Sequence, residues 1–292
     1  MSLEMRSEVM DSSQNHSSSV SLYGGTSPRR VNVRDLALAK ANNDRWPMIT
    51  AYDAQTARIF DQAGFPVILV GDSAAMVVYG YDNTVPVTIE ELLPLVRAVV
   101  RGSSRAMVVA DLPFGSYQAS PAQALETASM FMKDGGAHAV KLEGGHTILP
   151  QIELLVSSGI PVIGHLGLTP QSVNLLGGYR VQGRGESGER LLQDAKALES
   201  VGVSAVVLEV VPADLAARVT DMLSIPTVGI GAGPSTDAQV IVWQDMAGLT
   251  PDPLPKFVRR YANLADTLDA AAREWARDVV NGTFPNENES YQ

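Results

Sequence analysis

The most constraining feature of this 292-residue chain is a recurring pattern: a short apolar segment, then polar residues, then a helical segment. Its clearest example is Val67–Val70, four apolar residues followed directly by Gly71, Asp72 and Ser73. An uninterrupted, mostly β-branched run of this length is typical of a strand buried on both faces, as in a parallel sheet. Ligands of such proteins bind at the carboxyl ends of the strands. We therefore expect the functional residues at these strand ends.

Eight such strands are predicted along the chain. They span residues 48–51, 67–70, 107–110, 139–143, 161–164, 205–208, 226–230 and 240–243. Eight alternations of strand and helix favour a closed (β/α)8 TIM barrel over an open doubly wound sheet. The open sheet is further disfavoured because no Gly-x-Gly-x-x-Gly motif follows the first strand. The predicted fold class is thus α/β, a TIM barrel with an extra N-terminal helix over 33–40 and C-terminal helices over 254–263 and 264–280.

A single domain accounts for most of the chain. Residues 30–285 are predicted to form one barrel catalytic domain, and residues 286–292 a frayed C-terminus. Residues 1–29 are rich in Ser, Asn and Gly with few large apolar side chains, which predicts a disordered tail. This tail contains three acidic residues and no apolar core segment, so neither a signal peptide nor a transit peptide is predicted. Cytoplasmic localisation is expected.

Composition excludes several classes of function. The net charge of −10 disfavours nucleic acid or an anionic membrane surface as a partner. The chain has no cysteine, which excludes disulfides, zinc–thiolate sites, iron–sulfur clusters and cysteine nucleophiles. No apolar run approaches the roughly 20 residues of a membrane span. Small molecules are therefore the expected partners.

Polar side chains lie at the ends of the predicted strands. They are Asp72, Asp111, Lys141, Glu143, His165 and Glu209, with Ser73 beside the first. In a barrel all strand ends meet at one rim, so these residues would converge. Singly, each has a simpler interpretation: Ser73 as a turn former or helix cap, Lys141 as the partner of Glu143 in a rim salt bridge, and His165 as a structural histidine. Together, however, four carboxylates repel one another unless a cation or proton offsets their charge, which favours a metal-assisted site.

The chemistry of such a rim follows from its ligand types. Carboxylates with one histidine and no cysteine suit a hard cation such as Mg²⁺, which typically keeps water or substrate oxygens in its coordination shell. Such an ion would chelate an α-keto acid and stabilise the enolate that forms when the α-proton leaves. A base is also needed. Glu209 follows a very apolar strand, and we expect desolvation to raise its pKa towards useful basicity.

Two loops add further signals. Residues 229–233 resemble the phosphate-binding loop after strand seven of TIM barrels, although their glycines equally suit a tight turn without a ligand. The segment 168–188 is long for a connection between a strand and a helix. Its length favours a lid or a binding loop.

Five motifs together resemble one enzyme family. They are Gly71-Asp72-Ser73, Ala110-Asp111-Leu112-Pro113-Phe114, Val140-Lys141-Leu142-Glu143-Gly144-Gly145, Gly164-His165-Leu166-Gly167-Leu168-Thr169-Pro170-Gln171 and Gly229-Ile230-Gly231-Ala232-Gly233. From about residue 31 to Pro285 the chain closely resembles the ketopantoate hydroxymethyltransferases (3-methyl-2-oxobutanoate hydroxymethyltransferases), which belong with the phosphoenolpyruvate/pyruvate-type barrels. The resemblance implies transfer of a hydroxymethyl group from 5,10-methylenetetrahydrofolate to 3-methyl-2-oxobutanoate (α-ketoisovalerate). The product would be ketopantoate (2-dehydropantoate), formed through a Mg²⁺-stabilised enolate in pantothenate biosynthesis.

The resemblance also implies roles for individual residues. Asp72 and Asp111 match the family's metal-binding aspartates, and Glu143 matches its third metal-associated carboxylate. Glu209 matches the catalytic base. The positions that hold the keto acid are matched by Asp72, Ser73, Asp111, Lys141 and His165. The implied cofactor is Mg²⁺, the implied partners are the keto acid and the folate co-substrate, and the family is typically a cytoplasmic homodecamer.

Two other classes of function stay open from the sequence. A carbon–carbon lyase of the same superfamily would use the same metal–enolate chemistry. A non-catalytic barrel would bind a keto acid without turning it over, although the presence of Glu209 argues against this. Incubation with the keto acid and methylenetetrahydrofolate separates these classes from a hydroxymethyltransferase.

Overall fold

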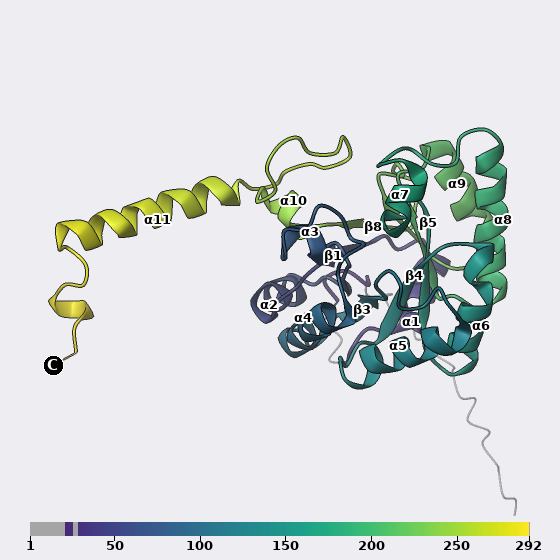
Figure 1. The fold of residues 1–292 in the computed structure, drawn as a ribbon, viewed down its shortest axis with the longest axis horizontal. Helices are drawn as coiled ribbons and strands as arrows, with labels where there is room; N and C mark the ends of the chain where they lie inside the picture. The colour runs from purple at the N-terminus through teal and green to yellow at the C-terminus, as the bar shows by residue number, and fades with distance from the viewer. Residues whose placement is uncertain (1–20, 26–28, 292) are drawn as a thin grey trace, which may run out of the picture.

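Eight parallel strands form a closed barrel in the computed structural model, which describes residues 21–25 and 29–291 (Figure 1). The strands are β1 Trp46–Thr50, β2 Val67–Val70, β3 Met107–Asp111, β4 Ala139–Glu143, β5 Val162–Gly167, β6 Ala205–Glu209, β7 Thr227–Ile230 and β8 Ala238–Ile241. Each strand pairs with the next in parallel, and β8 pairs with β1, which closes the sheet. The predicted fold class, an α/β barrel of the (β/α)8 type, is confirmed.

Burial on both faces explains the apolar character of the strands. In β2, Val67 and Leu69 belong to the cluster inside the barrel, whereas Ile68 and Val70 belong to the cluster between strands and helices. Successive side chains of a strand point to opposite faces of the sheet. A strand that is buried on both faces therefore needs apolar residues at all of its positions. The same alternation decides which polar side chains reach the barrel interior.

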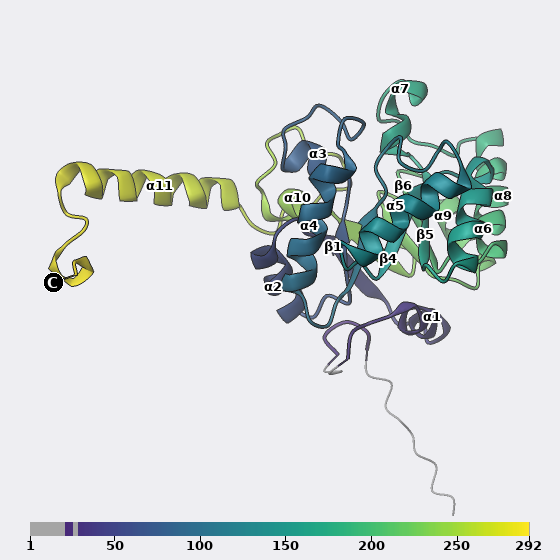
Figure 2. The same ribbon diagram turned by 60° about the horizontal axis from the view of Figure 1, so that its bottom comes forward.

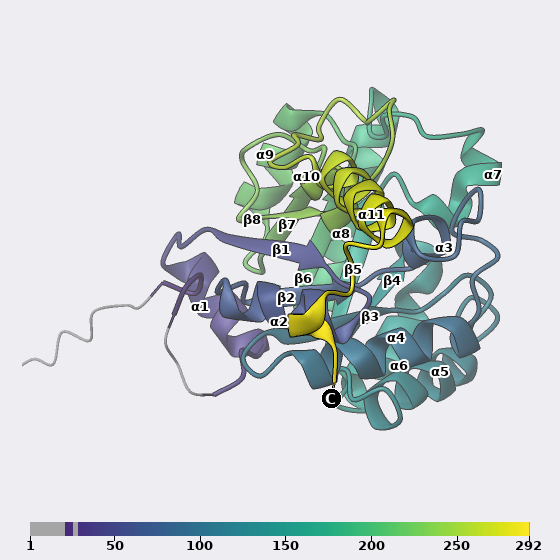
Figure 3. The ribbon, with the colours of Figure 1, turned by 90° about the vertical axis from the view of Figure 1, so that its left-hand side faces the viewer.

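Six helices surround the barrel and cover the outer faces of its strands (Figures 1 and 3). They are α2 Ala54–Gln62, α4 Ile89–Gly102, α5 Pro121–Lys133, α6 Leu149–Ser157, α8 Glu186–Ser200 and α9 Ala213–Met222. Helix α4 shows why these segments are helical. Thr88 and Glu91 form a capping box at its start, and Leu92, Val96 and Val99 recur at helical spacing and are buried.

The N-terminal end of the barrel is covered by α1, Val33–Ala41, the extra helix that the sequence predicts (Figure 2). The Asn32 side chain caps its first turn. Leu36 belongs to the same buried cluster as Trp46 and Met48 inside the barrel. The apolar closure of this end leaves the carboxyl ends of the strands as the place for a site.

Part of the predicted tail contacts the barrel. Residues 1–20 and 26–28 lie outside the described residues, so the disorder predicted for them is not tested. Residues 21–25 differ from that prediction: the Ser21 hydroxyl and the Leu22 N–H both donate to the Asp44 carboxylate, at 2.9 and 2.7 Å. Arg105 donates to the Leu22 carbonyl. These contacts are polar, and a scarcity of large apolar residues does not reveal them.

The eighth strand is displaced from its predicted position. The sequence predicts residues 240–243, but β8 ends at Ile241 and Trp243 begins a short helix, α10, Trp243–Ala247. The Trp243 N–H donates to the hydroxyl of Thr50 at 3.1 Å. This bond to β1 draws the backbone away from the strand direction, although the apolar run continues.

The helix predicted over residues 254–263 is wrong, because this segment contains no helix in the structure. Pro253 and Pro255 flank its start, and proline disfavours helical geometry in the residue before it. Phe257 instead packs against Gly231, where an added Cβ would lie 2.8 Å from the ring. A tertiary contact thus overrides the helical spacing of the segment.

The second predicted C-terminal helix is present as α11, Leu264–Asn281, and it extends away from the barrel (Figures 1 and 2). None of its residues is buried. Its apolar residues nevertheless follow helical spacing, with Leu268, Trp275 and Val279 on one face. Leu268 is 54% exposed and Trp275 is 58% exposed. The helix therefore presents an apolar stripe that stays largely exposed, although the Trp275 ring packs edge-on against Phe284.

The last described residues form a short 3-10 helix, η3, Glu287–Glu289, where a frayed end is predicted. The Asn286 side chain caps it by accepting a hydrogen bond from the Asn288 N–H at 2.9 Å. All of these residues are exposed. None of the helices in the described part of the chain combines the length and the hydropathy that a membrane-spanning segment requires.

Candidate active site

The alternation along the strands directs the predicted site residues into the barrel. Four of them follow, two positions later, a residue of the inner apolar cluster, so both side chains of each pair point the same way. The pairs are Val109 and Asp111 in β3, Ala139 and Lys141 in β4, Ile163 and His165 in β5, and Val207 and Glu209 in β6. Glu143 follows Lys141 at the same spacing. Titratable groups thus replace apolar ones at the top of the barrel interior.

These residues meet in one cavity of about 380 Å³. All the predicted site residues line it: Asp72, Ser73, Asp111, Lys141, Glu143, His165 and Glu209. The expected convergence of the strand ends is therefore confirmed, while the role of each residue stays a prediction. Because β5 is longer than predicted, His165 lies inside the strand rather than beyond its end.

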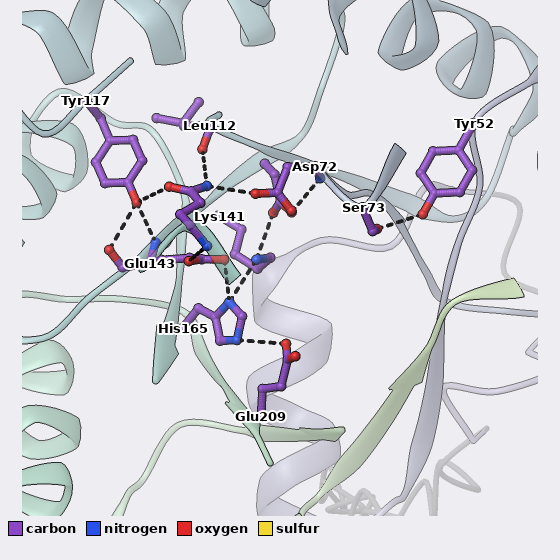
Figure 4. Close-up of polar contacts among 11 residues, drawn as sticks. Tyr52, Asp72, Ser73, Leu112, Tyr117, Lys141, Glu143, His165 and Glu209 are labelled. Atoms are coloured by element: carbon purple, nitrogen blue, oxygen red, sulfur yellow. Dashed lines mark hydrogen bonds and ion pairs between the residues drawn. The ribbon is translucent and has the colours of Figure 1, made fainter. Parts of the chain in front are cut away.

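Lys141 is the central cation of the cavity, and its side chain is 5% exposed (Figure 4). Its Nζ lies 3.0 Å from Oδ1 of Asp111. The ion pair is therefore with Asp111 and not with Glu143, as the simpler interpretation of the sequence supposes. Burial lowers the pKa of Lys141, but the negative charges of Asp111 and Glu143 outweigh it and raise that pKa above its ordinary value. Lys141 is therefore charged at neutral pH.

His165 connects the other carboxylates (Figure 4). Its Nε2 lies 3.2 Å from Oε2 of Glu209, and its Nδ1 lies 3.4 Å from Oε1 of Glu143 and 3.1 Å from Nζ of Lys141. Burial and Lys141 lower the pKa of His165, but its contacts with the carboxylates of Glu143 and Glu209 raise that pKa to about 9. His165 therefore lies between two glutamates and Lys141, and it is not an isolated structural histidine.

The carboxylates are crowded, which bears on the predicted metal. Burial, and then the charges of Asp111 and Glu143, raise the pKa of Asp72 well above its ordinary value. Burial also raises the pKa of Asp111. The buried Oε1 of Glu143 accepts no hydrogen bond from the described residues. Hard oxygen donors with unsatisfied charge fit a divalent cation such as Mg²⁺.

The same carboxylates do not form a complete cage for a metal. In the described part of the chain, no three histidine, aspartate or glutamate side chains are arranged as a ready metal cluster. Mg²⁺ is usually bound through one or two carboxylates, with water or substrate oxygens in its other positions. The donor set therefore fits Mg²⁺ with an incomplete protein shell, and the assignment of Asp72, Asp111 and Glu143 as its ligands stays a prediction.

Ser73 is not a helix cap, although the sequence allows that interpretation. It precedes a short helix, α3, Ala74–Val77, and its side chain makes no capping hydrogen bond. The hydroxyl lies 2.8 Å from the Tyr52 hydroxyl instead. A Cβ on Gly71 would lie 2.7 Å from Oγ of Ser73, so a side chain at position 71 would displace this hydroxyl. The turn holds Ser73 at the cavity wall beside Asp72.

Glu209 is the last residue of β6. Its side chain is 17% exposed, more than that of any other charged residue predicted for the site. Val207, Val210 and Ile230 surround it in the cavity wall. The predicted apolar surroundings are present, but His165 adds a polar contact that the strand pattern does not show. Glu209 thus has a free path to a molecule in the cavity.

Comparison with known proteins decides the family. The family model for ketopantoate hydroxymethyltransferase matches residues 30–287. The chain belongs to the ketopantoate hydroxymethyltransferase family. The 3-methyl-2-oxobutanoate hydroxymethyltransferase of Thermobifida fusca is 65% identical over 277 residues, which are 94% of this chain and 99% of that protein. That of Mycobacterium bovis is 57% identical and covers 92% of this chain and 96% of its own. The recognition from the five motifs is confirmed.

Solved structures of other proteins share the fold. Phosphonopyruvate hydrolase in complex with oxalate and Mg²⁺ aligns with a TM-score of 0.58 at 15% identity, over 89% of this chain and 93% of that chain. 2,3-Dimethylmalate lyase, of the PEP mutase/isocitrate lyase superfamily, aligns with a TM-score of 0.55 at 17% identity, over 89% and 91%. At these identities the likeness concerns the fold, and it agrees with the barrel type predicted for ketopantoate hydroxymethyltransferases.

Sequence reasoning missed the polar groups that support the site. Gln171 donates to Asp72, Tyr117 contacts Gln171 and the backbone of Glu143, and Tyr52 contacts Ser73. Gln171 closes the motif Gly164–Gln171, so its place in a family motif was visible. Nothing in the types of these residues indicates a role, because uncharged side chains in loops have many other uses.

The two loops highlighted by the sequence have different outcomes. Leu168, Pro170 and Tyr179 of segment 168–188 line the cavity, so the interpretation as a lid or binding loop is supported. The glycines of residues 229–233 have steric reasons instead. Gly233 has a φ of +78°, and a Cβ there would lie 2.4 Å from Cβ of Ala213. A tight turn thus explains this loop without a phosphate.

We expect Lys141→Met to destabilise the protein by about 3–5 kcal/mol in the absence of divalent cations, because it leaves Asp111 buried without its partner. The double variant Lys141→Met, Asp111→Asn should recover much of this loss. Urea unfolding at pH 7 of the wild type, both single variants and the double variant measures the coupling. A Lys141→Met variant as stable as the wild type would contradict the pairing.

Proposed function

We propose that this chain transfers a hydroxymethyl group from 5,10-methylenetetrahydrofolate to 3-methyl-2-oxobutanoate and forms ketopantoate for pantothenate synthesis. Family membership and the names of relatives at 57–65% identity support this activity over a carbon–carbon lyase. The observation that carries the proposal is that one cavity contains two separate groups of charged residues. Lys141 and three carboxylates form one group, whereas Glu209 contacts only His165 among the charged residues that the structure describes.

The first group suits the binding of an α-keto acid. Lys141 offers a positive charge to the substrate carboxylate, and the Ser73 hydroxyl, held by Tyr52, offers a hydrogen bond. Asp72 and Asp111, with Glu143 near them, would hold Mg²⁺. When bound, this ion would supply the positive charge that lowers the energy of an enolate.

Glu209 is the proposed base. Its carboxylate takes the proton from C3 of the keto acid, so that the C–H bond breaks and the electron pair passes into the enolate. His165, at 3.2 Å, orients this carboxylate. Water hydrolyses the one-carbon unit of the folate, which breaks its bonds to nitrogen and releases formaldehyde and tetrahydrofolate. The enolate carbon then bonds to the carbonyl carbon of formaldehyde, and the resulting alkoxide takes the proton back from Glu209 to give the hydroxymethyl group. The cavity wall formed by Leu168, Pro170 and Tyr179 is the proposed contribution of segment 168–188 to folate binding.

Removal of metal should abolish activity. After treatment with EDTA and desalting, the protein should form no ketopantoate, and added Mg²⁺ should restore product formation, because the buried carboxylates need a cation to bind the keto acid. Asp72→Ala should fail to respond to Mg²⁺. Product formation from both substrates is measured by mass spectrometry. Full activity in metal-stripped protein would refute the role of the metal.

Glu209→Gln isolates the proton transfer. The amide keeps the shape of the side chain but cannot accept the C3 proton, so deuterium exchange at C3 of 3-methyl-2-oxobutanoate should fall by roughly 10²–10⁴-fold. NMR follows this exchange with Mg²⁺ present and folate absent. Binding of Mg²⁺ and of the keto acid should be retained. Glu153→Gln, on the outer helix α6, is the matched control and should exchange at the wild-type rate. Exchange at the wild-type rate in Glu209→Gln would move the search for the base to Asp245 or His165.

We further propose that the chain is a cytoplasmic homo-oligomer, a homodecamer by family resemblance, in which α11 packs on a second copy. Three observations support this assembly. The apolar stripe of α11 is solvent-exposed in one chain, the helix extends away from its own barrel (Figures 1 and 2), and Gln239 on the outer face of β8 is exposed. A stripe of this kind normally covers another surface.

Placing a charge in the stripe should break the assembly. Trp275→Glu should lower the mass measured by light scattering after gel filtration, because the charge would have to be buried at the interface. Arg277→Glu, on the opposite face of the helix, is the matched control and should leave the mass unchanged. A Trp275→Glu variant with the mass of the wild type would show that α11 does not hold the copies together.

A further inference from the structure

The three carboxylates assigned to Mg²⁺ share a pattern: the protein occupies one oxygen of each. Oδ2 of Asp72 accepts from Nε2 of Gln171 at 2.9 Å, and Oε2 of Glu143 accepts from the Gln171 N–H at 3.0 Å. Oδ2 of Asp111 accepts from the Asp72 N–H at 3.0 Å. One residue, Gln171, thus fixes two of the three carboxylates. Of the other oxygens, Oδ1 of Asp111 contacts Lys141 and Oε1 of Glu143 lies 3.4 Å from Nδ1 of His165, and none of the three accepts a hydrogen bond from the described residues that would keep a cation away.

Gln171 lies in η2, Pro170–Ser172, directly after β5, and is 5% exposed. Its side chain uses its full capacity of two donors and two acceptor positions. Nε2 donates to Asp72 and to the Leu112 carbonyl, both at 2.9 Å, and Oε1 accepts from Tyr117 at 2.8 Å and from Gln118 at 3.2 Å. No polar atom of this side chain is left for substrate.

The Leu112 carbonyl determines how the amide is oriented. A carbonyl only accepts, so the atom facing it must be the NH₂ group of Gln171. The same NH₂ group then donates to Asp72. A donor therefore faces the carboxylate in every state of the site, and a glutamate at this position would place an acceptor there.

Tyr117 completes this chain and is almost fully buried (Figure 4). Its hydroxyl accepts from the Glu143 N–H at 3.1 Å and donates to Gln171 Oε1 at 2.8 Å. The hydrogen bonds thus run in one direction, from the backbone of Glu143 through Tyr117 and Gln171 to the carboxylate of Asp72. The arrangement couples the strand end of β4 to the turn after β2.

We propose that Gln171 is a positioning residue that holds Asp72 and Glu143 with one oxygen each turned towards a divalent cation, and that Tyr117 acts through it. The inference rests on the proposed function, because it takes these carboxylates as the metal-binding groups. Gln171 touches neither the cation nor the substrate. It fixes the carboxylates before the cation arrives, so that less order has to be created on binding.

Gln171→Met tests the inference, because methionine has a similar length and no hydrogen-bonding amide. The substitution keeps the backbone bond to Glu143 and removes only the bonds of the side chain. EPR titration with Mn²⁺, with Mg²⁺ as competitor, gives the dissociation constant of the purified full chain without substrate. We expect this constant to rise about 10–100-fold, the usual effect of losing a group that orients a metal ligand. Tyr117→Phe should raise it by a smaller factor.

Gln151→Met is the matched control, since Gln151 is another buried glutamine, which donates to the Gln118 carbonyl and to no carboxylate. Its metal affinity should equal that of the wild type. Thermal unfolding shows which variants fold, and Tyr117→Phe carries the test if Gln171→Met does not fold. Unchanged affinity in the folded variants, or an equal loss in Gln151→Met, overturns the inference alone. A wild type that binds no divalent cation overturns the metal part of the proposed function as well.

Discussion

The structure depends on a charged cluster held inside a barrel that is otherwise apolar. Lys141 is buried among Asp111, Glu143 and Asp72, and its pKa is raised because their charges outweigh the effect of burial. Breaking such a cluster on one side costs several kcal/mol, because the remaining charge stays out of water. The cluster lines a cavity, where the proposed cation and keto acid would complete it. The carboxyl ends of the strands therefore suit the binding of a ligand, whereas the apolar interior at the opposite end of the barrel stabilises the fold.

The strand geometry allows a charged cluster and an apolar core to share the interior of one barrel. Because side chains alternate across each strand, apolar residues such as Val109 and Val207 fill the lower interior, and Asp111 and Glu209 follow them at the top. In most strands the outer side chains are apolar and pack against the surrounding helices, whereas β8 carries the exposed Gln239 on its outer face. Charge is thus concentrated at one end of the barrel while the strands β2 to β6 keep two buried faces. Uncharged groups, Gln171 and Tyr117 among them, then fix the charged groups in place.

Outside the barrel, α11 exposes apolar side chains to solvent, whereas the barrel buries charged ones. Its sequence alternates apolar and polar faces as a packed helix does, yet no residue of it is buried in one chain. The segment before it contacts the barrel through Phe257, so the helix starts from a fixed point. An apolar stripe of this kind is most simply explained by a surface that a single chain does not contain. Assembly and catalysis would then depend on different parts of the sequence.

The sequence by itself determined the eight strands, the class of barrel and the residues at its rim, because these follow from local apolar runs and from the period of two along a strand. It also determined the family, since five motifs occur in order. Only the tertiary structure decided that Lys141 pairs with Asp111, that Ser73 faces Tyr52, and that Gln171 holds Asp72. The structure likewise removed the helix expected over 254–263 and added contacts for residues 21–25. These features depend on groups far apart in the chain, whose distances are set by closure of the barrel and carry no local periodicity.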